Sequence, residues 1–473
     1  MRGCASKSTS NFATQNNHST TLIVNKEIFR IAIPNIISNI TVPLMGLVSA
    51  AIVGRDSGTA AAIGALNLGV YIFNFIYWNC SFIRMGTSGL TAQAYGAGDF
   101  HETTAMLARA TVISLALSAI VLIFQRPLGE FSLWLMGGNE VVADYFYARI
   151  WAVPAGILLF GFYGWFVGMQ NGVIPMAISI TVNTLHVLFG WWFVFQFDMG
   201  IVGIAYASVV SQWIGLALAL TLIFTYFRKT FTKIVLREVL DFASMKRFFK
   251  VNGDIIVRTF CNVGVYTFFA AASAKMGKNG TCDDAVLAVN STLMQLLMLF
   301  SYMNDGFAYA AEAMTGRFIG AKDIFSLKKC LRYCVVWTFA TAIIAIGLYL
   351  VSWEWLFTFF LDNGSEGGSG AELVTVLEVA KQYIGWIVVI PLFAALPFML
   401  DGVYAGATLT RAMRNSMLFA TIIFFAVFYA LKPIMGNDAL WLAFLTYIIF
   451  RLVLQYFMAD RLKDIYRQIE KIA

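Results

Sequence analysis

Long apolar stretches, separated by short polar segments, recur along the whole chain. At about 20 apolar residues per membrane span, this pattern predicts twelve transmembrane helices, with ends defined only to within a few residues. The predicted spans are residues 28–53, 60–83, 104–125, 142–169, 173–197, 200–227, 248–274, 284–312, 328–360, 375–406, 412–434 and 438–460. The pattern therefore predicts an all-α integral membrane protein.

The two halves of the chain resemble each other. TAQAYGAGD at 91–99 aligns without gaps with TGRFIGAKD at 315–323, and GWFVG at 164–168 matches GVYAG at 402–406. Many transporters are built from such internal repeats, with the binding site between the halves. We therefore expect two six-helix bundles with the same orientation in the membrane, related by pseudo-two-fold symmetry.

The repeat and the polar segments divide the chain into five parts. We predict a disordered cytoplasmic tail, an N-terminal six-helix lobe (the N-lobe), a basic linker between the lobes, a C-terminal six-helix lobe (the C-lobe) and a second cytoplasmic tail. Their predicted bounds are residues 1–27, 28–227, 228–247, 248–460 and 461–473.

Composition supports a membrane protein and argues against several other classes. Hydrophobic residues make up 59% of the chain and charged residues 12%, whereas soluble domains carry about 25% charged residues. The net charge of +7 therefore indicates topology and not nucleic-acid binding. The chain contains no HExxH, GxSxG or GxxxxGK[ST] motif, so we expect neither an enzyme nor an ATP-driven pump. Its scattered cysteines and three histidines do not predict a metal centre.

Lysine and arginine gather in the links after the sixth and eighth predicted helices. Residues 228–250 hold seven of them and residues 317–332 hold five, whereas the link at 361–374 has acidic residues and no basic one. Loops that carry an excess of basic residues stay in the cytoplasm. We therefore expect both termini to be cytoplasmic.

Four ionisable residues interrupt two of the apolar spans. A charge at the centre of a spanning helix costs about 2.5–3.5 kcal/mol, so such residues usually face a bundle interior or a watery cavity. Asp254 and Arg258 are four residues apart, and we predict that they form an ion pair. The alternative is a switch in which protonation of Asp254 releases Arg258. Asp305 and Glu312 are seven residues apart and share one helix face.

Asp305 and Glu312 are therefore candidates for binding a proton or another cation. A low-dielectric cavity disfavours the charged form of a carboxyl group, which lets it take up and release a proton near neutral pH. The alternative for Glu312 is structural: it is solvated near the cytoplasmic end of its helix, or it pairs with Arg317.

Five stretches occur together and in the order typical of one transporter family. They are FIRMGTSGLTAQAYGAGD (82–99), NGDIIVRT (252–259), DGFAYAAEAMTG (305–316), LDGVYAGATLTRAMRNSM (400–417) and GNDALWLAF (436–444). On these motifs the chain resembles the multidrug and toxic compound extrusion (MATE) transporters, of the DinF-like branch.

The resemblance implies two six-helix bundles in a V around a central cavity, in the inner membrane of a bacterium. It also implies an antiporter that exports amphipathic organic cations or other toxic compounds in exchange for protons or sodium. We accordingly expect no cofactor, a monomer, and no partners other than the lipid bilayer and a small-molecule substrate. The alternative is a flippase-like exporter of a lipid-linked or anionic metabolite. The mixed charges of the predicted spans favour the cation exporter.

The chain departs from the family pattern at two acidic positions of the N-lobe. Where the family has a pattern like GLVDTAxVG, this chain reads GLVSAAIVG, with Ser49 in place of the aspartate. Where the family has GNxLNIxLD, it reads VNTLHVLFG, which keeps Asn183 but has His186 and Gly190 at the later positions. Both carboxylates that resemble the family's N-lobe coupling site are therefore missing.

Two further interpretations concern single residues. His186 is a candidate proton carrier, because imidazole titrates at about pH 6.5. The alternative is a hydrogen-bonded packing residue. Arg84 and Asp401 lie inside matching motifs near helix ends, and we interpret both as architectural.

Overall fold

The computed structural model describes residues 5–57, 59–239, 241–275, 284–362 and 370–458. Within these ranges, twelve segments are long and apolar enough to cross a membrane. The all-α fold class and the number of predicted spans are confirmed. The predicted tail at 461–473 lies outside the described residues.

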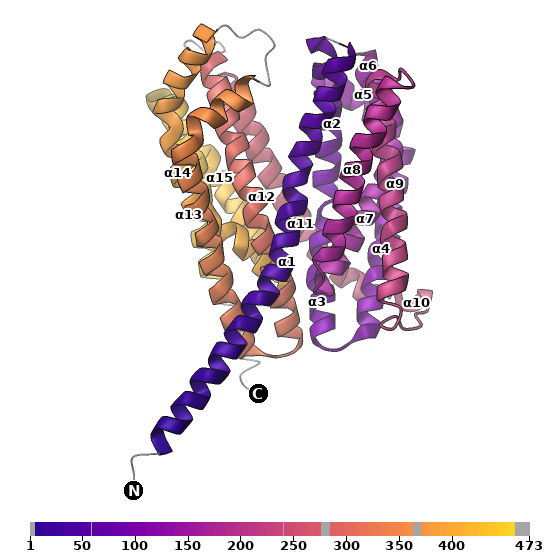
Figure 1. The fold of residues 1–473 in the computed structure, drawn as a ribbon, viewed down its shortest axis with the longest axis vertical. Helices are drawn as coiled ribbons and strands as arrows, with labels where there is room; N and C mark the ends of the chain where they lie inside the picture. The colour runs from indigo at the N-terminus through magenta and orange to yellow at the C-terminus, as the bar shows by residue number, and fades with distance from the viewer. Residues whose placement is uncertain (1–4, 58, 240, 276–283, 363–369, 459–473) are drawn as a thin grey trace.

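Two helical bundles stand side by side, converging at the lower end of Figure 1 and diverging toward the upper end. The N-lobe contains α1 (Ala5–Ser57), α2 (Ala60–Cys80), α3 (Phe82–Gly96), α4 (Phe100–Ile123), α5 (Gln125–Met136), α6 (Glu140–Arg149), η1 (Ile150–Ala152), α7 (Val153–Gly168), α8 (Val173–Phe195) and α9 (Gly200–Tyr226). The C-lobe contains α11 (Phe242–Ser273), α12 (Asp284–Gly320), α13 (Ile324–Asp362), α14 (Gly370–Gly406), α15 (Thr410–Met435) and α16 (Asn437–Met458).

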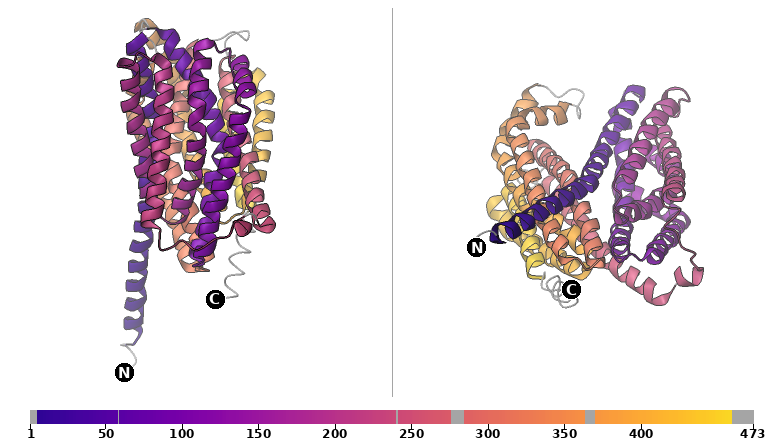
Figure 2. Two further views of the ribbon diagram at one scale, coloured as in Figure 1. Left: turned by 90° about the vertical axis from the view of Figure 1, so that its right-hand side faces the viewer. Right: turned by 60° about the horizontal axis from the view of Figure 1, so that its bottom comes forward.

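The basic links lie at the end where the bundles converge. The short helix α10 (Leu236–Val239) lies in the predicted linker 228–247, and Figure 1 shows it at this end, together with the turn from α12 to α13. The described chain also begins and ends on this side (Figures 1 and 2). The arrangement fits the predicted orientation, in which this is the cytoplasmic side.

The first helix begins earlier than we predicted. We expected a disordered tail over 1–27, but α1 begins at Ala5. Neither glycine nor proline occurs between residue 5 and Pro34, so nothing in the sequence stops the helix there. The part of α1 that can cross a membrane is Ile23–Asp56, which contains the predicted span 28–53.

α1 crosses from one lobe to the other. Near the start of its membrane-crossing part, Asn25 Oδ1 accepts a hydrogen bond of 3.0 Å from Trp337 Nε1 on α13 of the C-lobe. Farther along, Thr41 Oγ1 accepts one of 2.6 Å from Asn183 Nδ2 on α8 of the N-lobe. Figure 1 shows the resulting diagonal path of α1 in front of both bundles.

The second span extends to Gly96, beyond the predicted end at 83, and it consists of two helices, because the chain turns at Ser81 between α2 and α3. The Ser81 hydroxyl donates a hydrogen bond of 2.7 Å to the Trp78 carbonyl oxygen. Serine side chains that bond to nearby backbone carbonyls often bend helices. The break places the first turn of α3 beside the space between the lobes.

The repeated sequence motifs mark the places where helices pack most closely. A Cβ built at Gly96 would meet the backbone of Arg317, and a Cβ at Gly320 would meet the backbone of Gln93. Gly96 and Gly320 are equivalent positions of the two repeats, and so are Gln93 and Arg317. The contact between α3 and α12 is therefore reciprocal, as a pseudo-two-fold axis between the lobes requires.

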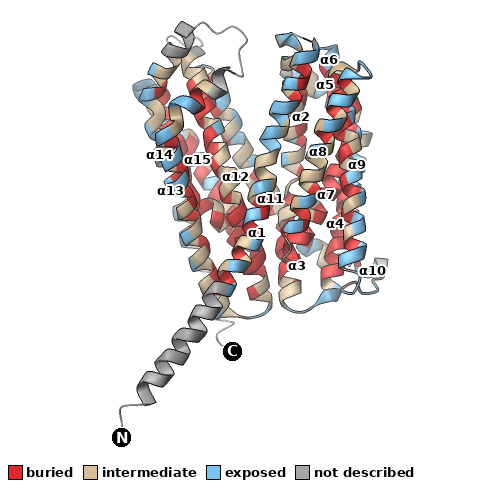
Figure 3. Cartoon of the chain, viewed as in Figure 1, coloured by how far each residue is buried: buried red, intermediate tan, exposed pale blue. Residues whose placement is uncertain are grey.

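Buried residues fill the interior of each bundle, and exposed ones cover much of its outside (Figure 3). Large apolar side chains such as Trp134, Val351 and Tyr456 are among the exposed residues. Extensive apolar surface of this kind marks contact with a membrane.

Candidate functional site

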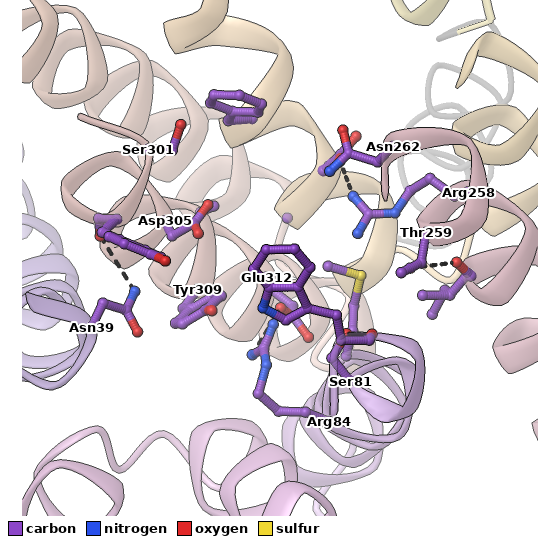
Figure 4. Close-up of a pocket in the computed structure, with 18 of the residues that line it drawn as sticks. Asn39, Ser81, Arg84, Arg258, Thr259, Asn262, Ser301, Asp305, Tyr309 and Glu312 are labelled. Atoms are coloured by element: carbon purple, nitrogen blue, oxygen red, sulfur yellow. Dashed lines mark hydrogen bonds and ion pairs between the residues drawn. The ribbon is translucent and has the colours of Figure 1, made fainter. Parts of the chain in front are cut away.

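A cavity of about 320 Å³ lies where α3 of the N-lobe faces the C-lobe. Its walls come from α1, α2 and α3 on one side and from α11, α12, α14 and α16 on the other (Figure 4). Three carboxylates and three guanidinium groups line it: Asp305, Glu312, Asp401, Arg84, Arg258 and Arg451. The formal charges of this central cavity therefore balance.

Glu312 and Arg84 form an ion pair between the lobes. Glu312 on α12 is fully buried, and its Oε2 lies 3.7 Å from Nη1 of Arg84 on α3. The Arg84 guanidinium also lies over the Tyr309 ring, 3.9 Å from its centroid. Neither carboxylate oxygen of Glu312 makes a hydrogen bond of normal geometry to another described residue. Arg84 is therefore the main counter-charge of a deeply buried carboxylate.

Asp305 lines the same cavity in a different environment. It is partly exposed, and Figure 4 shows it between Ser301 and Tyr309. Within the part of the chain that the structure describes, its carboxylate has neither an ion pair nor a hydrogen bond. Asp305 is thus an acidic group in the cavity that is available to a ligand.

Asp401 lies at the centre of a buried charged network. Its Oδ2 accepts hydrogen bonds from Arg258 and Arg451, and its Oδ1 accepts one of 2.7 Å from Gln455 Nε2. Arg451 is only 2% exposed. Buried charges are stable only when they are paired and hydrogen-bonded, so this network joins α11, α14 and α16.

The predicted pair of Asp254 and Arg258 is wrong. Asp254 accepts hydrogen bonds of 2.6 Å from Arg414 Nη1 and 2.9 Å from Thr410 Oγ1, both on α15. Arg258 instead reaches Asp401 on α14. The spacing of four residues permits a pair along α11, but partners on neighbouring helices hold both side chains. Asp254 consequently lies outside the lining of the central cavity.

Two arginines of these networks were missed by the sequence analysis. Arg451 interrupts the apolar stretch WLAFLTYIIFRLVLQYFM, so the cost of an intramembrane charge could have identified it as it did Asp254. Arg414 lies inside a family-like motif, and the sequence did not single it out. Arg84 is in the central cavity, where it contacts Glu312.

The N-lobe candidates form a separate cluster between α1, α8 and α9. His186 is buried, with Nε2 3.0 Å from Ser49 Oγ and Nδ1 3.2 Å from Ser208 Oγ. None of Ser49, Asn183 and His186 lines the central cavity. The cluster shows that His186 packs with two hydroxyl partners, and a role in coupling stays a prediction.

We expect His186→Ala to retain gradient-driven export but to change its pH optimum. The substitution removes the imidazole partner of Ser49 and Ser208, but each hydroxyl keeps its hydrogen bond to a backbone carbonyl oxygen of its own helix, so the protein should still fold. Initial efflux rates measured against pH, at matched membrane levels, test this expectation. The exposed His101→Ala is the control. If His186→Ala removed all export, the N-lobe would be the coupling site.

The sequence model of the MatE family matches the chain over residues 34–192 and 259–431. These two segments fall in the two lobes and together span more than half of the chain. The chain belongs to the MATE family. It is therefore a multi-pass membrane protein and an efflux transporter, not an enzyme.

Individual relatives agree with this assignment. The chain is 30% identical over 435 residues to the DNA damage-inducible protein F of Escherichia coli, covering 90% of each. A MOP superfamily transporter from Pyrococcus furiosus has the same fold, with a TM-score of 0.80 at 17% identity, and the match covers 94% of this chain and 97% of that one. An outward-facing multidrug resistance MATE transporter matches with a TM-score of 0.79 at 16% identity, covering 94% and 97%.

Proposed function

We propose that this MATE transporter is a secondary antiporter that exports amphipathic organic cations in exchange for protons. The observation that carries the proposal is the Asp305 carboxylate, which has no partner among the described residues and lies in a cavity whose other acids face arginines. A cationic substrate would supply the missing counter-charge. Aromatic side chains of the same cavity offer cation–π and apolar contacts to the rest of the molecule: Trp78, Tyr266, Tyr302, Tyr309 and Phe398.

Glu312 is the proposed coupling residue. Its carboxylate faces the Arg84 guanidinium, which would repel a sodium ion at this place but does not hinder protonation. Protonation of Glu312 would remove the attraction between α12 and α3, that is, between the lobes. Loss of an interlobe ion pair is a direct way to let two lobes rock around a central site.

The alternative is the export of a lipid-linked or anionic metabolite. One observation favours it: three arginines line the cavity. The Pyrococcus furiosus relative is itself described as having a binding pocket of reverse polarity that suggests a different function. In this chain, however, Asp401 binds Arg258 and Arg451, which leaves little positive charge for an anion.

Everted membrane vesicles would test both the substrate and the coupling ion. Fluorescent organic cations and fluorescent organic anions are offered separately, under an imposed proton gradient or an imposed sodium gradient. The proposal expects transport of cations with the proton gradient alone. Transport of anions would support the alternative, and transport with the sodium gradient alone would exclude proton coupling at Glu312.

We also propose that the transporter works as a monomer in a bacterial inner membrane, with both termini in the cytoplasm. A cytoplasm-active reporter fused after Ala473 is expected to be active, because the basic links 228–250 and 317–332 lie on the side where the described chain begins and ends. The same fusion with a reporter that functions only outside the membrane should be silent. The reverse result would invert the topology.

A further inference from the structure

A second cavity, of about 250 Å³, lies between the start of α11 and the start of α15. It is separate from the central cavity, with which it shares no lining residue. Its lining residues are Arg247, Lys250, Val251, Asp254, Thr408, Leu409, Thr410, Arg411 and Ala412. The transport mechanism proposed above uses none of them.

The charge of this second cavity is strongly positive. Arg414 Nη1 lies 2.6 Å from Asp254 Oδ1, so the acid of the lining is already neutralised. Within the described ranges, Lys250 and Arg411 have no ion pair, and Arg247 donates only to the neutral Gln93 Oε1, at 3.3 Å. Three cationic groups therefore converge on one hollow without an acid to balance them.

The backbone adds to this positive potential. α15 begins at Thr410, and no side chain caps its first turn. The unpaired N–H groups at a helix start attract anions, phosphate in particular. The hollow therefore combines point charges and N–H donors in the way that phosphate recognition requires.

The surroundings distinguish a lipid from a free anion. Phe242 and Phe249 are 78% and 56% exposed on α11, the helix that carries Arg247 and Lys250, and Lys246 Nζ lies 6.0 Å from the Phe242 ring centroid. Exposed aromatic rings beside basic side chains are typical of a membrane interface. The second cavity is lined by residues of α11, the helix that follows α10 in the chain, and α10 lies at the end where the basic links gather. Basic pockets between helices on the cytoplasmic side bind anionic headgroups.

We propose that the second cavity binds the phosphate of an anionic phospholipid headgroup from the cytoplasmic leaflet. A lipid bound in this cavity would affect the contact between the lobes. Gln93 of α3 donates to the Gly406 carbonyl oxygen at 2.8 Å and accepts from Arg247, so the hollow lies beside a contact between the lobes. A bound headgroup would tie the linker end of α11 to α15 at this contact.

Thermal unfolding of the purified full-length transporter in detergent tests the site, with phosphatidylglycerol, phosphatidylcholine or inorganic phosphate added. We expect phosphatidylglycerol to raise the unfolding temperature by several degrees, and the other two to have little effect. The triple variant Arg247→Gln, Lys250→Gln, Arg411→Gln should lose this rise. The control variant Arg228→Gln, Lys229→Gln, Lys233→Gln removes the same charge from exposed linker positions and should keep it.

Native mass spectrometry of bound lipid provides a second readout, and Lys250→Gln alone serves if the triple variant does not fold. Fewer bound phosphatidylglycerol molecules on Lys250→Gln than on the control would support the site. An equal rise with inorganic phosphate would overturn the lipid assignment. Equal lipid retention by the cavity and control variants would overturn the site itself.

Discussion

Replacing Glu312 with glutamine should abolish gradient-driven export while the transporter still folds and inserts. Glutamine has nearly the shape of glutamate, but it neither carries a charge to attract Arg84 nor binds and releases the proton. The lobes would then lose the interaction that responds to the gradient.

Asp305→Asn should also abolish export, because it removes the carboxylate that is free to pair with a cationic substrate. Initial efflux rates against pH, at matched membrane expression, measure both effects.

The matched control is Glu378→Gln, which changes an exposed carboxylate of the C-lobe away from the central cavity. It should export like the unmodified chain. Normal export by the double variant Asp305→Asn, Glu312→Gln would refute the assignment of both residues. Loss of export with Asp305→Asn but not with Glu312→Gln would keep the substrate site and remove Glu312 as the coupling group.

Replacing Asp401 with asparagine should cause the largest loss of stability. The substitution leaves two arginines, Arg258 and Arg451, inside the C-lobe without their carboxylate. Removing one partner of a buried pair typically costs about 3–5 kcal/mol. Thermal unfolding in detergent and the amount of protein in the membrane should both fall.

A compensating variant separates this charge effect from a packing effect. Adding Arg258→Gln to Asp401→Asn removes one of the two uncompensated charges and should recover part of the loss, as a double-mutant cycle would show. Asp198→Asn is the control, because Asp198 is exposed in a turn with a positive φ that asparagine also tolerates. Equal stability of Asp401→Asn and the control would mean that the arginines find other partners.

Hydropathy alone could predict the twelve spans, because each span must present apolar residues to lipid whatever lies behind it. The sequence repeat also explains why Gly96 and Gly320 each pack against the backbone of the opposite lobe. Close helix crossings need small residues, and symmetry imposes them twice. The spacing of seven residues was also enough to predict that Asp305 and Glu312 share a face of α12, and both line the central cavity.

The partners of the charged residues could not be predicted in this way. Spacing along α11 puts Asp254 and Arg258 on one face, but it does not say which helix lies opposite. α15 supplies Arg414 to Asp254, and α14 supplies Asp401 to Arg258. The start of α1 was missed because a polar composition was taken as disorder, although no residue there breaks a helix.

The diagonal course of α1 has a consequence for how the protein is made. α1 is synthesised first, yet the first turns of its membrane-crossing part pack on the C-lobe: the ring centroids of Phe29 and Trp337 are 4.6 Å apart. At about 5–20 residues per second, the 312 residues between Asn25 and Trp337 take on the order of 15–60 s to emerge from the ribosome. Throughout that interval Asn25 and Phe29 of α1 lack their partner Trp337. The contact between α1 and α13 therefore forms only late in synthesis, after the N-lobe partners of α1 on α8 have already been made.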